Sequence, residues 1–219
     1  MYENEGIMME IKPFPNGIFG ATTYLIWDEE SLDGAMVDCT SSVDEIEKII
    51  KKEKINLKYI LITHGHFDHV YCLNQIKEKF KDALILMNKE DVSLLNHLPD
   101  QCLMAEVDEV KIPCIDGFLD ENSKNLKLGN NEIRIIHTPG HTEGGVCYLI
   151  NDILFSGDTI FKNSIGRCDL YGGDFNKIEK SIKEKIFKLN DNITVYPGHG
   201  DKTTIGYEKK YNSYFGANA

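Results

Sequence analysis

The segment Thr63-His64-Gly65-His66-Phe67-Asp68-His69 (THGHFDH) places three imidazoles and one carboxylate within seven residues. It follows an apolar run, KYILIT, that is typical of a buried strand. In an extended segment alternate side chains point to the same side, so His64 and His66 can face one metal ion together. Asp68 and His69 fall where the chain turns into a predicted helix, and they point in another direction. This geometry favours two ions side by side, and it predicts that other parts of the chain supply further ligands.

Three later segments repeat the order of strand, small residues and metal-binding side chain. They offer His137 and His141 in IRIIHTPGHT, Asp158 in ILFSGDT and His199 in ITVYPGHG. Each signal is weak alone, because Asp and His are common in glycine turns. Together with the first motif they supply enough ligands for two metal ions. Asp158 can bridge two cations, because a carboxylate has two oxygens.

Apolar runs alternate with amphipathic stretches along the whole chain, which predicts an α/β fold. Strands are predicted at 21–27, 34–38, 58–63 and 83–87, and helices at 42–53, 70–80 and 175–190. Hairpins are predicted around Gly129-Asn130-Asn131 and Asn151-Asp152. Ser42 and Glu45 are expected to form a capping box at the start of the first helix. No linker or low-complexity tract interrupts residues 1–219, so we predict a single domain.

Two strand–helix–strand units of the sequence are similar to each other. The first runs from GAMVD to KYILITHGH and the second from ILFSGD to NITVYPGHG, and in each the first strand ends on Asp and the second near His. This pattern suggests two similar halves whose strand ends meet at one cleft. Open α/β sheets usually bind their ligands at such a place.

The composition excludes some classes of partner. The net charge of −11 argues against binding to a nucleic-acid backbone, which depends on clustered Lys and Arg. No apolar run approaches the roughly 20 residues that span a bilayer. Residues 1–12 have no basic segment followed by an apolar one, so we expect no secretory signal. The six cysteines form no C-x-x-C pair, and we expect reduced thiols in a cytoplasmic protein.

The motifs THGHFDH, TPGHT, SGDTIF and PGHG resemble the metal motifs of the metallo-β-lactamase fold superfamily. The resemblance implies a four-layer αββα sandwich with the site at one edge. It implies two ions with one carboxylate between them: His64, His66 and His141 for the first ion, Asp68, His69 and His199 for the second, and Asp158 between the two. Asp38 matches a family position just behind the site, where it would support the ligands. His137 and His97 fit no ligand position and are expected to be structural.

The segments GDTIFKNSIGRCDLYGGD and YPGHGDKTTIGYEKKYN resemble the small, single-domain glyoxalase II-like hydrolases. The implied reaction is hydrolysis of a small-molecule thioester, such as a hydroxyacyl-glutathione, by a hydroxide shared between two divalent ions. Zinc is the expected metal, with iron or manganese as alternatives. Asp68 and Asp158 are the predicted catalytic residues, and Asp158 would orient the hydroxide. A thiol of pKa about 8.5 can leave as thiolate without a dedicated acid.

Arg167 falls where the larger glyoxalase II enzymes have a lysine that contacts glutathione. We therefore predict that Arg167 binds the substrate, and an ion pair with Asp169 is the structural alternative. After His199 the chain has Gly200 and Asp201, where glyoxalase II has acidic and tyrosine residues that hold glutathione. This difference leaves the identity of the thiol carrier open.

A second reading comes from the persulfide dioxygenases, which share this fold and have a run similar to Gly166-Arg167-Cys168-Asp169. They hold a single iron with two His and one Asp, a set that leaves positions open for oxygen. Here His64 or His66 would act with His141 and Asp158. Other hydrolases of the fold, such as lactonases, are a third alternative. Residues 88–125 carry no signal that favours any of these functions.

Overall fold

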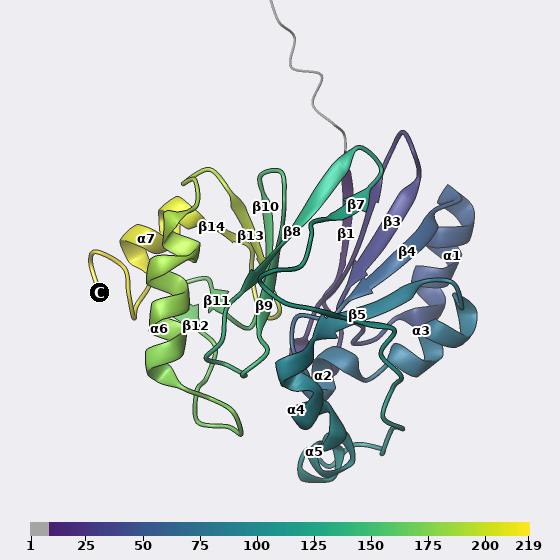
Figure 1. The fold of residues 1–219 in the computed structure, drawn as a ribbon, viewed down its shortest axis with the longest axis horizontal. Helices are drawn as coiled ribbons and strands as arrows, with labels where there is room; N and C mark the ends of the chain where they lie inside the picture. The colour runs from purple at the N-terminus through teal and green to yellow at the C-terminus, as the bar shows by residue number, and fades with distance from the viewer. Residues whose placement is uncertain (1–8) are drawn as a thin grey trace, which may run out of the picture.

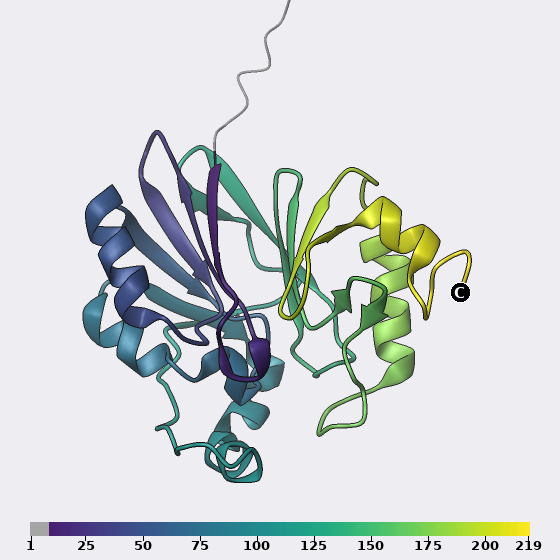
Figure 2. The ribbon, with the colours of Figure 1, turned by 180° about the vertical axis from the view of Figure 1, so that it is seen from behind.

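Two six-stranded β-sheets face each other in the computed structural model, which describes residues 9–219, and helices cover their outer sides (Figure 1). The strand order is β1-β2-β3-β4-β5-β6 in the first sheet and β14-β13-β10-β9-β8-β7 in the second. Helices α1 and α3 lie outside the first sheet, and α6 and α7 lie outside the second (Figures 1 and 2). The predicted four-layer αββα sandwich is therefore confirmed.

The elements of the first half are β1 (Met9–Phe14), a 3-10 turn η1 (Ile18–Gly20), β2 (Thr23–Asp28), β3 (Asp33–Val37), α1 (Val43–Glu53), β4 (Asn56–Leu61), α2 (Phe67–Val70), α3 (Leu73–Lys79), β5 (Leu84–Asn88), η2 (Lys89–Asp91), α4 (Val92–Asn96), α5 (Leu98–Met104) and β6 (Gly117–Leu119). Those of the second half are β7 (Leu126–Leu128), β8 (Asn131–His137), β9 (Val146–Ile150), β10 (Ile153–Gly157), β11 (Ile160–Phe161), β12 (Ser164–Ile165), α6 (Phe175–Glu184), η3 (Ile186–Lys188), β13 (Thr194–Pro197), β14 (Thr203–Thr204) and α7 (Ile205–Tyr211). The antiparallel pairs β7–β8 and β9–β10 confirm the two predicted hairpins.

The two similar units of the sequence form equivalent parts of the two sheets. Strands β3 and β4 are parallel neighbours connected through α1, and β10 and β13 are parallel neighbours connected through α6. The carboxyl ends of parallel neighbours lie at the same edge of a sheet. Asp38, the THGHFDH segment, Asp158 and His199 therefore converge at one edge of the sandwich.

The apolar core has three layers, each of which lies between two neighbouring layers of secondary structure. One cluster lies between the two sheets and includes Tyr24, Val37, Tyr148 and Phe155. The other two clusters lie between each sheet and its own helices. On α6 the predicted stripe is buried at Ile178 and Ile182, as expected.

Three local predictions were wrong. Ser42 adopts a left-handed backbone (φ 61°) and its side chain does not cap α1, so the capping box is absent. The predicted helix 70–80 is interrupted before Leu73, because the amide of Cys72 donates to the Cys39 carbonyl (2.9 Å). Phe175, expected in the buried stripe of α6, is exposed and packs against Phe215 with ring centroids 5.6 Å apart.

The cysteines are free thiols: Cys39, Cys72, Cys102 and Cys147 are buried, Cys168 is half-buried and Cys114 is exposed. Between residues 9 and 219, no helix has the length and apolar character that crossing a membrane requires. The expected lack of a secretory signal concerns residues 1–12, of which 1–8 lie outside the described part.

Candidate metal centre

Segments that follow β4, β8, β10 and β13 bring all seven predicted metal ligands together at one edge of the sandwich. The ligand atoms form three groups, within each of which they lie no more than 4.8 Å apart: His64, His66 and His141; His64, His69 and Asp158; Asp68, His69 and His199. His137 and His97 lie outside these groups, as expected. His137 Nε2 donates to the Glu143 carbonyl (3.0 Å), and His97 Nδ1 donates to the Ser93 carbonyl (2.8 Å).

The spacing between the imidazole nitrogens fits bound cations. His66 Nδ1 lies 2.9 Å from His141 Nε2, which lies 3.2 Å from His64 Nε2. In the other group His69 Nε2 lies 3.2 Å from His199 Nε2. Two nitrogens bound at about 2.0–2.1 Å to a tetrahedral metal ion are about 3.3 Å apart. The nitrogens are therefore already close to the spacing that coordination requires.

Asp158 lies between the two outer groups. Its Oδ1 is 3.4 Å from His69 Nε2, and its Oδ2 is 3.5 Å from His141 Nε2 and 3.6 Å from His199 Nε2. Oδ1 is buried and has no hydrogen-bond partner among the described residues. A buried carboxylate oxygen without a partner is costly, and a neighbouring cation would satisfy it. The residues thus fit two divalent cations with Asp158 between them.

Behind the ligands, Asp38 fixes two of the imidazole rings. Its Oδ2 accepts hydrogen bonds from His69 Nδ1 (2.7 Å) and from the Thr63 hydroxyl (2.8 Å). That hydroxyl in turn accepts a bond from His64 Nδ1 (3.0 Å). These contacts leave Nε2 of His64 and His69 free to bind metal, which is how supporting carboxylates act in metal sites. His141 is fixed in the same way, because its Nδ1 donates to the Arg167 carbonyl (2.7 Å).

Asp91 connects two of the ligand loops, and the sequence reasoning missed it. It occupies the residue before α4, where an aspartate normally caps the helix, but its side chain makes no capping bond. The buried carboxylate instead accepts from the Gly65 amide (2.9 Å), the Thr142 hydroxyl (2.8 Å) and the Gly144 amide (2.5 Å). Gly65 lies between His64 and His66, and Thr142 follows His141. Asp91 therefore holds the loops that carry the first group of ligands.

The two outer groups have opposite electrostatic character. Burial lowers the pKa of His66 to about 3, and burial and the neighbouring imidazoles hold the pKa of His64 well below its usual value. Burial would also lower the pKa of His69, but the carboxylates of Asp158 and Asp38 raise it to about 10. His64 and His66 are therefore neutral and ready to bind a cation at neutral pH. His69 must release a proton before it can bind one.

A pocket of about 480 Å³ opens over the ligands. Besides His66, Asp68, His141, Asp158 and His199, it is lined by Phe19, Phe67, Leu94, Gln101, Met104, Ala105, Arg167, Leu170 and Tyr171. Leu94, Gln101 and Met104 belong to α4 and α5, and Ala105 directly follows α5, in the region where the sequence carried no readable signal. Arg167 lines the pocket and also pairs with Asp169 through two bonds of 2.7 and 2.8 Å, so both sequence interpretations of Arg167 have a structural basis.

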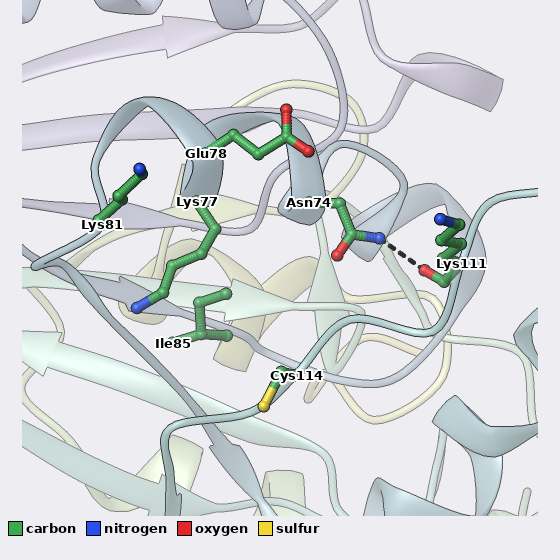
Figure 3. A pocket seen from close by; sticks show the side chains of 7 residues that line it. All are labelled: Asn74, Lys77, Glu78, Lys81, Ile85, Lys111 and Cys114. Atoms are coloured by element: carbon green, nitrogen blue, oxygen red, sulfur yellow. Dashed lines mark hydrogen bonds between the residues drawn. The ribbon is translucent and has the colours of Figure 1, made fainter.

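A second hollow, of about 340 Å³, lies beside α3 (Figure 3). It is lined by Asn74, Lys77, Glu78, Lys81, Ile85, Lys111 and Cys114. The Lys77 ammonium is already paired with Asp116 (2.8 Å), and Asn74 Nδ2 donates to the Lys111 carbonyl (2.6 Å). None of the metal-binding side chains lines this hollow, so it is separate from the candidate metal centre.

The chain resembles known proteins over nearly its whole length. The family model described as the metallo-beta-lactamase superfamily matches residues 16–199. The hydroxyacylglutathione hydrolase GloC of Haemophilus influenzae is 34% identical over 208 residues, covering 94% of this chain and 98% of GloC. The B3 metallo-beta-lactamase BLEG-1 superposes with a TM-score of 0.85 at 30% identity, covering 94% of this chain and 99% of BLEG-1. The protein TTHA1623, solved in a di-iron-bound form, superposes with a TM-score of 0.83 at 27% identity, covering 93% of this chain and 100% of TTHA1623.

Two mixed sheets flanked by helices, with His and Asp ligands collected at one edge, define a metal-binding class of α/β protein. The chain belongs to the metallo-beta-lactamase superfamily. Its histidine-rich centre has the composition of the superfamily's binuclear sites, and the protein is a metal-dependent hydrolase.

Proposed function

We propose that the protein hydrolyses a small-molecule thioester with the help of two divalent cations, for which zinc is the first choice. One cation would be held by His64, His66 and His141, the other by Asp68, His69 and His199, and Asp158 would lie between them. Bound cations of this kind lower the pKa of a coordinated water and polarise a carbonyl group. The similarity to a hydroxyacylglutathione hydrolase supports the choice of substrate class.

The composition of the pocket wall is the observation that carries the proposal. Among residues 9–219, the titratable groups that line the pocket, apart from the metal-binding side chains, are those of Arg167 and Tyr171. A guanidinium does not give up its proton in proteins, and the Tyr171 hydroxyl already lies 3.3 Å from the Ser93 hydroxyl. An alcohol or amine leaving group needs a proton donor, whereas a thiol of pKa about 8.5 can leave as its anion. The wall is suited to a thioester.

Residues of the protein orient the water, hold the metal ligands in place and bind the substrate. Asp158 provides the carboxylate shared by both cation sites, and in that position it would orient the attacking water molecule. The imidazoles of His64 and His69 are held by Thr63 and Asp38, so their Nε2 atoms stay aimed at the site. Arg167 supplies a positive charge at the pocket for an anionic thiol carrier. The strongly acidic chain makes a nucleic-acid substrate unsuitable.

The test uses one metal-free preparation reconstituted separately with zinc and with ferrous iron. Each form is assayed for cleavage of lactoylglutathione and other simple thioesters, and for oxygen uptake with glutathione persulfide. We expect the zinc form to release one thiol per turnover, equally well without oxygen, and to lose activity to a chelator. Oxygen uptake by the iron form alone, with no thioester cleavage by either form, would refute the proposal in favour of a dioxygenase.

A further inference from the structure

Large apolar side chains are exposed around the mouth of the metal-centre pocket. Phe19, Met104 and Tyr171 are 70%, 84% and 63% exposed, respectively, and all three line the pocket. They come from three separate parts of the chain: η1, the end of α5 and the loop before α6. An isolated exposed apolar residue is ordinary, but a cluster around a metal centre marks a surface for an apolar ligand.

The backbone at Phe19 supports a role in ligand binding. Phe19 has φ 54°, a left-handed conformation that is costly for a bulky residue. The turn is held on both sides, by a bond from the Gly17 amide to the Ala21 carbonyl (3.0 Å) and by one from the Thr22 amide to the Gly198 carbonyl (2.8 Å). The ring packs edge-on against Phe67 with centroids 5.5 Å apart, next to the ligand segment. Burial in the core does not explain this strained placement, because most of the ring is exposed.

Another part of the apolar wall comes from α5. Gln101 of that helix accepts a hydrogen bond from the Phe67 amide (3.0 Å) and donates to the Leu94 carbonyl (2.9 Å), which connects α5 to the ligand segment and to α4. Met104, at the end of α5, reaches the pocket with an unbranched side chain that adapts to ligand shape. The wall is thus rigid at Phe67 and adaptable at Met104.

Arg167 and Phe19 lie near different ligand groups of the pocket. Arg167 lies beside the first ligand group, since its carbonyl binds His141, whereas Phe19 lies near the second group, since Ala21 pairs with His199 in an isolated β-bridge. A ligand bound across both groups would reach Arg167 at one end and Phe19 at the other. Small thiol carriers bear polar and anionic groups, so the carrier suits the Arg167 end and the acyl group suits the apolar end.

Building on the proposed thioesterase function, we propose that the preferred substrates carry a medium-chain or phenyl-bearing acyl group. This group lies on Phe19, Phe67 and Met104, while the anionic carrier points towards Arg167. Phe19 and Met104 are then residues that determine acyl specificity. A short hydroxyacyl group such as lactoyl would leave most of the wall unused, and its thioesters would be poor substrates.

The test compares acetyl, butanoyl, hexanoyl and phenylacetyl thioesters of one carrier, glutathione, with the metal-reconstituted full chain. We expect kcat/KM to rise about two- to fourfold for each methylene added, since a buried methylene contributes about 0.8 kcal/mol. Phe19→Ala and Met104→Ala should each reduce this dependence, lowering kcat/KM for the hexanoyl thioester more than for the acetyl thioester. The matched controls are Leu103→Ala, next to Met104 on α5, and Phe118→Ala on β6. Both wild-type side chains are exposed but do not line the pocket.

A second measurement does not depend on turnover. Calorimetric binding of acetate, butanoate, hexanoate and octanoate to the wild-type protein should tighten with chain length, and it should tighten less in Phe19→Ala. Cleavage without any dependence on acyl length, or an equal gain when the apolar group is moved to the thiol side, would overturn the acyl assignment and leave the thioesterase proposal standing. Failure to cleave any thioester would overturn the thioesterase proposal itself.

Discussion

Replacement of Asp91 tests whether the metal centre depends on a residue that binds no metal. The carboxylate accepts three hydrogen bonds at a site that is 1% exposed. In Asp91→Ala, the Gly65 and Gly144 amides and the Thr142 hydroxyl all lose their acceptor. Each bond to a charged group is worth about 1.5–3 kcal/mol, and removal of the buried charge offsets part of the loss. We expect a net destabilisation of about 3–5 kcal/mol.

Asp91→Asn should have a smaller effect for a geometric reason. Oδ2 accepts from both Gly65 and Thr142, whereas Oδ1 accepts from Gly144 alone. An amide oxygen in the Oδ2 position keeps two bonds, and the amide nitrogen then faces the Gly144 amide, donor against donor. The expected loss is about 2–3 kcal/mol, which for a chain of this length lowers the Tm by roughly 4–12 °C. Thermal unfolding of the metal-free protein measures this effect.

Measurement of metal affinity shows whether Asp91 supports the metal ligands or only stabilises the fold. Asp91→Asn should weaken binding at the His64, His66 and His141 group by about 10- to 100-fold, as loss of a supporting residue does in other metal sites. Competition with a chromophoric chelator measures the affinity. Glu208→Gln is the matched control, because Glu208 is also fully buried and accepts from Thr203 (2.6 Å), Asn212 (2.8 Å) and the Asn163 amide (3.0 Å), none of them a metal ligand. A stability loss in Asp91→Asn with unchanged affinity would refute the reasoning.

Three further predictions concern the centre and its pocket. Asp158→Asn should lower kcat about 100-fold or more and reduce the bound metal below two ions per chain, because an amide binds a cation more weakly than a carboxylate does; near-normal activity with two ions bound would contradict this role. Arg167→Ala should raise KM for an anionic thioester and leave kcat and neutral thioesters nearly unchanged; equal losses for both substrates would make Arg167 structural. Because His69, with a pKa of about 10, must lose a proton to bind metal, affinity at the second group should rise by up to about tenfold per pH unit between pH 7 and 10. Metal affinity at the first group should change little over that range, because His66, of pKa about 3, is already neutral. Metal titrations at several pH values measure this, and an equal slope of affinity against pH for the two groups would contradict the reasoning.

The sequence by itself determined the two strand–helix–strand units and the candidate ligands that the structure brings together. Local hydrophobic period decides between strand and helix, and the β3–α1–β4 and β10–α6–β13 units are visible because each is short and continuous. The ligands are visible for a related reason. Each follows a buried strand, so the topology of parallel strands brings Asp158 and His199 to the same edge as the THGHFDH segment.

Local signals failed where distant contacts overrode them. Asp91 and Ser42 both have the residue type of a helix cap, but neither side chain caps its helix. The contacts of the Asp91 side chain lie 26, 51 and 53 positions away along the chain. A residue that acts through such distant partners has no local periodicity, and the single sequence cannot show which partners it meets.

The pocket wall was decided only by the tertiary structure. Met104 and Leu103 are neighbours of similar apolar character on one short helix, and yet Met104 lines the pocket whereas Leu103 does not. Phe19 is as apolar as any core phenylalanine, but a left-handed turn places it over the metal centre. Composition fixes how apolar a side chain is, but the direction in which it points depends on the backbone path and on how α5 and η1 pack beside the ligand loops. The cluster of candidate ligands is therefore predictable from the chain, and the shape of the pocket beside it is not.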